Sequence, residues 1–387
     1  MAASGKTLFE PPTLHNKKKT DDLMMKKNSL YSWTRRAVVL PEVRLLVMLC
    51  LAACVVAAAG CVSSPASEKT PVKTNITTGT VTPGPSPTLA PALTLPVKRI
   101  IVTNANAAEL LMAIGAKDTI VGVSDTVKNH PVLGPQFADI ESIGTWQAPD
   151  VEKILSLHPD AVVSYASYLP KNIDKITASN ISVLQIDCYK IDTLASDTRK
   201  LGNITGHDKG AGEYIEFLQK YEALTQSRTA NLPTGSVPRV YFESYSDYTT
   251  LTGGSGADTL LSLAGGSNIA GLLPASSPKV NAEWVYAENP DVIIKVVAST
   301  QKNLTFQEVR SKLEARDGIR NVSAVQNGRV YVMSNDIVYG PRAVIGLLYF
   351  AYALHPDQFH DVSPPAILDE YAQRFVAGTN TSLYMYP

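Results

Sequence analysis

Beyond residue 97, short apolar runs alternate with segments whose apolar residues recur at three-and-four spacing. The short runs predict buried strands, and the spaced segments predict helices. Such alternation is typical of parallel strands joined by right-handed helical crossovers, which defines an α/β protein. We expect strands over 99–103, 119–123, 161–164, 181–186, 239–243, 291–297 and 329–333, and helices over 107–114, 148–157, 173–178, 257–263, 282–287, 305–314, 340–354 and 365–376.

A longer helix is predicted in the middle of this region, over residues 207–230. No glycine follows Gly212 there, no proline precedes Pro233, and apolar residues keep helical spacing. It is the longest uninterrupted helix that the sequence predicts. We therefore expect two α/β lobes joined by one helix, with the N-terminal lobe at 97–205, the connecting helix at 206–232 and the C-terminal lobe at 233–387.

Two segments of the chain have similar sequences, 149–163 in the first predicted lobe and 281–294 in the second. Each has a short helix, then a Pro-Asp pair, then a buried strand. Pro-Asp also makes a good helix-to-strand turn in its own right, so the repeat has a purely local explanation. Its occurrence in corresponding halves favours two similarly built lobes.

The N-terminal region has the form of an export signal. Basic residues precede an apolar stretch, 45–60, which ends in Ala58-Ala59-Gly60-Cys61, and 61–96 is a linker of Ser, Thr, Pro and Ala. This order indicates a signal segment over 1–60 with a lipid anchor on Cys61. Cys54 lies in a second acceptable cleavage box, and an uncut anchor is the alternative, although the stretch is short for a span of about 20 residues. Met24 or Met25 is a plausible true start.

Charge and cysteine content restrict the function further. The whole chain is formally neutral, with 35 basic and 35 acidic residues. Residues 1–60 hold nine Lys/Arg and four Asp/Glu, so the exported part has 26 against 31. This gives no basic face for nucleic acid. Only Cys188 lies in the folded body, so stability has to come from the apolar core.

Polar and aromatic residues gather after the predicted strands. Ligands of open α/β sheets bind outside the carboxyl ends of strands, and Tyr, Trp and Asn suit a flat ligand with polar edges. About half of the tyrosines are instead expected to cap the core. The candidate ligand-binding residues are Asn104, Asn106, Ser124, Trp146, Tyr165, Tyr168, Tyr245, Tyr248, Asp336 and Tyr339.

Several stretches, taken in order, resemble one known family, the class III or helix-linked substrate-binding proteins of ABC importers. That family binds iron–siderophore complexes, haem or vitamin B12. The resemblance implies two Rossmann-like lobes with parallel sheets joined by one long α-helix, and a receptor that passes its ligand to an ABC permease. It rests on 97–102, 108–115, 120–123, 143–146, 149–163, 263–266 and 340–349.

We expect the ligand to be an iron chelate, with a corrinoid as the alternative, and the protein to act as a monomer without a cofactor. The six histidines show no HxH or HExxH spacing, and there is no CxxC pair, so no resident metal is predicted. An extracytoplasmic hydrolase or chelatase-like enzyme on the same scaffold is the alternative of another class. Its mark would be a convergent nucleophile–base pair, which the sequence does not display.

Three charged residues have family-implied roles. Arg342 opens a predicted helix, where anions are favoured; it is expected in the cleft, with a solvated position or a lobe-bridging ion pair as alternatives. Family members dock on the permease with one glutamate per lobe, and Glu152 falls on that pattern. In the second lobe Ser262 occupies the position where the family has its acidic residue. Asp258, one helical turn earlier, is therefore expected to substitute.

Overall fold

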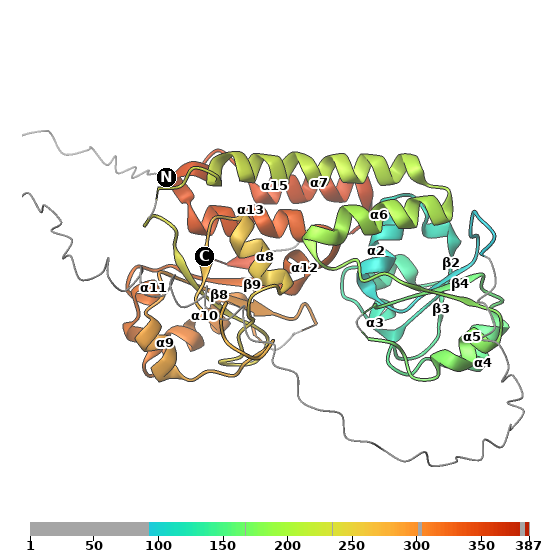
Figure 1. Cartoon of the computed structure of the whole chain (residues 1–387), viewed down its shortest axis with the longest axis horizontal. Coiled ribbons are helices and arrows are strands. Elements are labelled where there is room, and N and C mark those ends of the chain that lie inside the picture. The colour runs from blue at the N-terminus through green and yellow to red at the C-terminus, as the bar shows by residue number, and fades with distance from the viewer. Residues whose placement is uncertain (1–92, 167, 234, 301–303, 380–383, 387) are drawn as a thin grey trace, which may run out of the picture. The chain divides into compact units, whose positions relative to one another are not determined.

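The computed structural model describes residues 93–387, apart from 167, 234, 301–303, 380–383 and 387. Two five-stranded sheets form the centres of two α/β lobes (Figure 1). The signal segment, most of the linker and both candidate anchor cysteines, Cys54 and Cys61, lie outside the described residues. Within the described part, no helix has the length and apolar character needed to cross a membrane.

The N-terminal lobe has the strand order β3-β2-β1-β4-β5, and all its pairs are parallel. The three residues of β1 are completely buried, as the apolar run predicts. The strands are β1 (Ile100–Val102), β2 (Ile120–Val123), β3 (Glu141–Ser142), β4 (Ala161–Ser164) and β5 (Ser182–Gln185); the helices are α2 (Ala105–Ala113), η1 (Lys117–Thr119), α3 (Asp125–Lys128), η2 (Gly134–Phe137), α4 (Val151–Ser156), α5 (Ile173–Ala178) and α6 (Ile191–Thr205).

The C-terminal lobe has the order β10-β9-β8-β6-β7. Its pairs are parallel except for β10, which joins the edge of the sheet antiparallel to β9. The strands are β6 (Arg239–Glu243), β7 (Ser267–Asn268), β8 (Val292–Val297), β9 (Val330–Ser334) and β10 (Met385–Tyr386); the helices are α8 (Gly256–Leu263), α9 (Ala282–Glu288), α10 (Phe306–Glu314), η3 (Ile319–Asn321), α11 (Ser323–Gln326), α12 (Asn335–Val338), η4 (Gly340–Arg342), α13 (Ala343–Leu354), α14 (Pro356–Phe359) and α15 (Pro364–Phe375).

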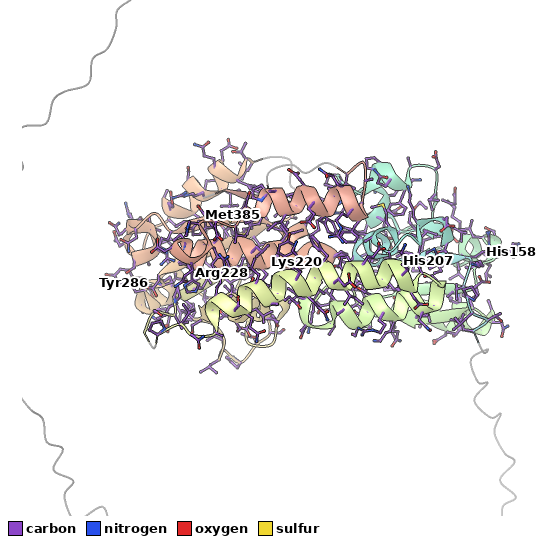
Figure 2. The ribbon with its side chains drawn as sticks, turned by 90° about the horizontal axis from the view of Figure 1, so that it is seen from above. His158, His207, Lys220, Arg228, Tyr286 and Met385 are labelled. Atoms are coloured by element: carbon purple, nitrogen blue, oxygen red, sulfur yellow. The ribbon has the colours of Figure 1, made fainter. Side chains whose placement is uncertain are left out.

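The long helix α7 (Asp208–Thr229) has 22 residues and connects the lobes, which confirms the helix-linked fold. In Figure 2 it runs from His207 on the side of the N-terminal lobe to Arg228 on the side of the C-terminal lobe. Helix α6, which the sequence analysis does not predict, packs along its first half. Gly202 permits this packing, because a Cβ there would lie 2.6 Å from the Cβ of Ala211. Bending α7 would break successive backbone hydrogen bonds, so the connection resists hinge opening.

One large apolar core runs through both lobes. It includes Leu110 of α2, Phe217 of α7, Leu348 of α13 and Tyr371 of α15. Figure 1 shows α7, α13 and α15 stacked on the same side of the two sheets. The C-terminal helices therefore tie the second lobe back to the first, in addition to α7.

The segment Gly340-Pro341-Arg342 makes a contact with the first lobe or with α7 at each of its three residues. Gly340 N donates to Tyr189 O over 2.9 Å. The hydroxyl of Tyr214, on α7, donates to Pro341 O over 2.7 Å. Arg342 bonds to Glu109 of α2. Three consecutive residues thus fix the junction of the lobes at one place.

Candidate ligand-binding cleft

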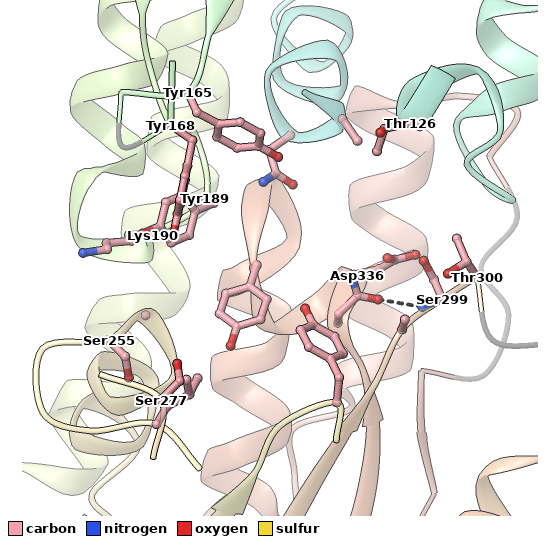
Figure 3. Close-up of a pocket in the computed structure, with 18 of the residues that line it drawn as sticks. Thr126, Tyr165, Tyr168, Tyr189, Lys190, Ser255, Ser277, Ser299, Thr300 and Asp336 are labelled. Carbon is pink, nitrogen blue, oxygen red and sulfur yellow. Dashed lines mark hydrogen bonds between the residues drawn. The ribbon is translucent and has the colours of Figure 1, made fainter. Parts of the chain in front are cut away.

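A cleft of about 810 Å³ lies between the lobes and takes its lining from both (Figure 3). The first lobe contributes residues after β1, β2, β4 and β5, and the second lobe residues after β6, β8 and β9, as expected for the carboxyl ends of parallel strands. The lining consists of Ala105, Asn106, Glu109, Thr126, His130, Leu133, Tyr165, Tyr168, Tyr189, Lys190, Tyr245, Leu251, Thr252, Gly253, Gly254, Ser255, Gly256, Ser276, Ser277, Ala298, Ser299, Thr300, Asn335, Asp336 and Tyr339.

The first lobe presents an aromatic wall, which we define as Tyr165, Tyr168 and Tyr189. Trp146 packs behind it, with its ring centroid 5.3 Å from that of Tyr165 and 6.2 Å from that of Tyr168, both edge to face. Tyr168 remains 67% exposed, so its ring is available to a ligand. Burial raises the pKa of Tyr165 to about 12, so its phenol stays protonated and can donate a hydrogen bond at neutral pH.

The second lobe presents a different surface, built from glycines and short hydroxyl side chains. We call it the hydroxyl wall and define it as Thr252, Gly253, Gly254, Ser255, Gly256, Ser276, Ser277, Ser299 and Thr300. Ser255 also caps α8, since its hydroxyl accepts from Asp258 N over 3.2 Å. Small uncharged groups of this kind bring backbone and hydroxyl donors and acceptors close to the rim of a ligand.

His130 and Asp336 meet across the floor of the cleft, one from each lobe. His130 Nε2 lies 3.5 Å from Asp336 Oδ1, and both side chains are largely buried. His130 Nδ1 accepts from the backbone amides of Val132 and Leu133. This geometry assigns the ring proton to Nε2, which points at the carboxylate. Burial opposes ionisation of Asp336, but the contacts with His130 and the charge of Arg342 outweigh it and hold the pKa of the carboxyl below its usual value.

Tyr245 enters the cleft from a loop that a buried charge network holds in place. Lys295 Nζ donates to Ser244 O and Tyr245 O and lies 3.0 Å from Glu243. Arg316 contacts the same carboxylate at 2.8 Å. Glu243 is completely buried, so its charge depends on these two cations. The network therefore fixes the backbone at the start of the loop that carries Tyr245.

Six of the predicted ligand-binding residues line the cleft: Asn106, Tyr165, Tyr168, Tyr245, Asp336 and Tyr339. The structure places the other five elsewhere. Asn104 and Ser124 are buried and structural, because Asn104 caps α2 and the Ser124 hydroxyl donates to Thr103 O. Trp146 supports the aromatic wall from behind. The ring of Tyr248 packs against the guanidinium of Arg316, whose Cζ lies 5.1 Å from the centroid of that ring.

Arg342, the fifth of these residues, is only 2% exposed. It forms an ion pair between the lobes, which was one of the alternatives for this residue. Its Nε donates to Glu109 Oε1 over 2.6 Å, and its Nη1 donates to the hydroxyl of Tyr384. A ligand in the cleft does not reach this guanidinium directly. The helix N-terminus that suggested an anion site is buried at the lobe junction instead.

Several lining residues of the first lobe were not predicted from the sequence, among them Thr126, His130, Tyr189 and Lys190. Tyr189 and Lys190 follow β5, so the strand-end rule that nominates the other residues would have found them. His130 carries no such signal, because it lies beyond the short helix α3 and reaches the cleft only through the fold. In the stretches that the structure describes, no group of three or more His, Cys, Asp or Glu side chains is arranged to hold a metal ion.

The two docking candidates differ in their surroundings. Glu152 is exposed in the first turn of α4. Asp258 is half-buried, and its two carboxylate oxygens accept hydrogen bonds from Gly254 N and Asn268 Nδ2, each at 3.0 Å. Its carboxylate is thus engaged within its own lobe, whereas that of Glu152 faces solvent.

Comparisons with known proteins agree with this architecture. A model of the periplasmic binding protein family matches residues 100–337. The vitamin B12-binding protein of Yersinia pestis (strain Pestoides F) is 29% identical over 218 residues, which cover 55% of this chain and 74% of that protein.

Two solved structures share the fold. The molybdate-bound periplasmic protein of a Haemophilus influenzae ABC transporter superposes with a TM-score of 0.64 at 20% identity, over 75% of this chain and 95% of that one. The periplasmic vitamin B12 binding protein of Vibrio cholerae gives 0.56 at 22% identity, over 68% and 98%. The chain belongs to the periplasmic binding protein family. Within it, this is a helix-linked substrate-binding protein of an ABC importer, which works outside the cytoplasm with a membrane permease.

Proposed function

We propose that this protein captures an iron chelate of the siderophore type and delivers it to its permease. The observation that carries the proposal is the interlobe cleft, in which five tyrosines face a surface of glycines and hydroxyl groups. Its volume of about 810 Å³ lies in the upper part of the range of roughly 300–1,000 Å³ for small-molecule sites. Aromatic faces suit the ligand shell of a bulky complex, and the hydroxyl groups suit its polar edges.

A small oxyanion fits this cleft poorly. Such an ion needs several donors or cations converging on a site of its own size. The described lining offers Lys190 and His130 as basic side chains, and His130 is already bonded to Asp336. The molybdate bound by the Haemophilus influenzae protein is therefore not the kind of ligand that we propose for this cleft.

A corrinoid is the second candidate. The observation that favours it is the match with vitamin B12-binding proteins, which spans three quarters of their length. A corrinoid shares with a ferric hydroxamate complex a bulky organic body around a metal ion and amide groups at its periphery. A corrinoid would offer its amide groups to the same aromatic and hydroxyl groups of the lining.

An enzymatic role finds less support. His130 is the histidine in the described lining, and its two ring nitrogens contact backbone amides on one side and Asp336 on the other. In that state it has no free nitrogen to activate a hydroxyl or a water. The hydrolase or chelatase-like alternative would need another base.

We further propose that Cys61 carries the lipid anchor and that the permease contacts acids on the far side of each lobe. Glu152 serves this role in the first lobe. In the second lobe Glu283 replaces Asp258, because it occupies the same place in the internal repeat. Each glutamate is exposed and follows a cap residue whose side chain accepts from the amide three positions on, Asp150 in α4 and Asn281 in α9. Figure 1 shows α4 and α9 on the side opposite α7.

Titration of the purified protein with a ferric trihydroxamate, a ferric triscatecholate, haemin and cyanocobalamin tests the proposal. Trp146 packs against two tyrosines of the aromatic wall, so quenching of its fluorescence reports binding there. We expect saturable binding of a ferric complex at micromolar concentration or below. Tight binding of cyanocobalamin alone would establish the second candidate, and binding of none of these would refute the proposed function.

A further inference from the structure

The described residues that line the cleft carry few charges, and these are nearly balanced. Among the described lining residues, the charged side chains besides His130 are Glu109, Lys190 and Asp336. Glu109 is neutralised by Arg342 over 2.6 Å, in a pair that is almost completely buried. Of the lining residues that the structure describes, this leaves one cation, Lys190, and one anion, Asp336, to meet a ligand.

Neither of the remaining charges is placed to neutralise several negative charges. Lys190 lies at one side of the cleft, with its ammonium 5.8 Å from the ring centroid of Tyr189. Asp336 lies on the floor with its carboxylate held ionised by His130 and Arg342. Its negative charge repels an anion that enters between the lobes, and the low polarity of a closed cleft strengthens the repulsion.

The hydroxyl wall adds polarity without charge. Ser276, Ser277 and Thr300 are exposed there, and each hydroxyl both donates and accepts. Primary and secondary amides are matched by such groups, because an amide also offers donors and an acceptor. Multiple carboxylates or catecholate oxygens would instead require arginine or lysine.

We propose that the ligand is a bulky metal complex with no net charge or a single positive charge, whose rim carries amide groups. The proposal rests on the proposed function and narrows it. A ferric trihydroxamate and a corrinoid both meet this description, whereas a ferric triscatecholate and ferric citrate do not. Binding should therefore depend on shape and hydrogen bonding and should vary little with salt.

Calorimetric titrations at two ionic strengths test this inference. We expect the better of ferric trihydroxamate and cyanocobalamin to bind at least about 100-fold more tightly than ferric triscatecholate, with a change in Kd below about threefold between about 0.05 M and 0.5 M NaCl. If the trihydroxamate binds, the ligand is a siderophore complex; if cyanocobalamin binds, it is a corrinoid. Tightest binding of the triscatecholate, or a steep loss of affinity with salt, would overturn the inference and leave the proposed function standing. Binding of none of these complexes would overturn both.

A charge added to the hydroxyl wall gives a second test. Ser277 is exposed in the cleft, so a longer side chain is accommodated without repacking the core. Ser277→Lys should raise the affinity for ferric triscatecholate by about tenfold, and Ser277→Gln, the uncharged control of similar length, should not. An equal response of the two variants would contradict the inference, because charge would then not limit binding.

Discussion

Arg342 Nε donates to Glu109 Oε1 over 2.6 Å, and the exposed fractions of the two side chains are 2% and 8%. The residues are far apart in sequence and come from different lobes. Tyr371 of α15 donates to the same carboxylate oxygen over 2.8 Å. The junction of the lobes is thus an almost completely buried polar contact inside an apolar core, and its Glu109 also belongs to the cleft lining.

Removing one partner of this pair should be costly. Glu109→Gln leaves the guanidinium of Arg342 buried without its counter-charge, which typically destabilises a fold by about 3–5 kcal/mol. We expect a loss of this size in the free energy of unfolding, measured by urea denaturation. Lys209→Gln, which removes an exposed ion pair with Glu213 on α7, is the control and should change stability by less than about 1 kcal/mol. Equal effects of the two variants would mean that the buried pair does not stabilise the junction.

Gly340 should tolerate a side chain poorly. Its φ is 83°, and a Cβ there would lie 2.5 Å from Asn106 Oδ1 across the lobe junction. Gly340→Ala should therefore lower the free energy of unfolding by about 2–4 kcal/mol. Gly328→Ala is the matched control, since its φ is 69° and no atom lies within 4 Å of the added Cβ. This control variant should lose only the free energy that the strained backbone costs, about 1–2 kcal/mol. If both variants lose the same stability, the side chain of Asn106 moves aside at little cost and the close approach does not limit this position.

Glu222 on α7 should make stability depend on pH. Burial raises the pKa of its carboxyl from 4.5 to about 6. The folded protein therefore holds this proton more tightly than the unfolded chain, and stability falls as pH rises from about 4.5 through 6. Glu222→Gln should remove this fall and stabilise the protein at pH 7 by about 1 kcal/mol, a value reduced for partial exposure of the side chain.

Urea denaturation at a series of pH values from about 4 to 8 checks this prediction, because that range spans the pKa of the Glu222 carboxyl in the unfolded and in the folded protein. Glu216→Gln, at an exposed position of the same helix, is the control. A stabilisation of the Glu222→Gln variant that stays constant across the whole range would contradict the assignment.

The permease contact predicts a separation of uptake from binding. Glu152→Ala and Glu283→Ala should each leave ligand affinity unchanged and lower transport in proteoliposomes by about tenfold, since loss of an interfacial charge pair costs affinity for the partner. Asp258→Asn should have a smaller effect on transport, because both of its oxygens are bonded within its own lobe. Full transport by the Glu152→Ala variant, or loss of its ligand binding, would refute the docking role.

Periodicity and strand propensity predict most of this fold. The strands at 161–164 and 239–243 and the helix at 173–178 agree with the structure residue for residue, and α7 differs from its predicted range by one residue at each end. These elements have clear apolar patterns and strong end signals. Helix α6 was missed although Ile191, Leu194 and Leu201 are buried at helical spacing. Gly202, near its end, serves the packing on α7, which local sequence does not reveal. The strands β3 and β7, with two residues each, are too short to show alternation.

The site was predictable only where it follows the strand ends. That rule finds Tyr165, Tyr245 and Asp336, because their position depends on the sheet alone. It does not find His130, and the helix N-terminus argument placed Arg342 in the cleft rather than at the junction, because the surroundings of both residues depend on which residue of the other lobe lies opposite. Such pairing between lobes is set by the packing of α2, α13 and α15 and has no local signature in the sequence.

Calorimetric titration of Tyr165→Ala with the ligand that binds the unaltered protein tests the central claim most directly. The ring of Tyr165 forms part of the aromatic wall and contacts Trp146, so its removal should weaken binding by at least about tenfold. Tyr286→Ala, at an exposed position on α9 that is 55% accessible and outside the cleft lining, is the control and should bind normally. We expect the first variant alone to lose affinity. Equal affinity of both variants and the unaltered protein would show that the ligand does not bind in the interlobe cleft.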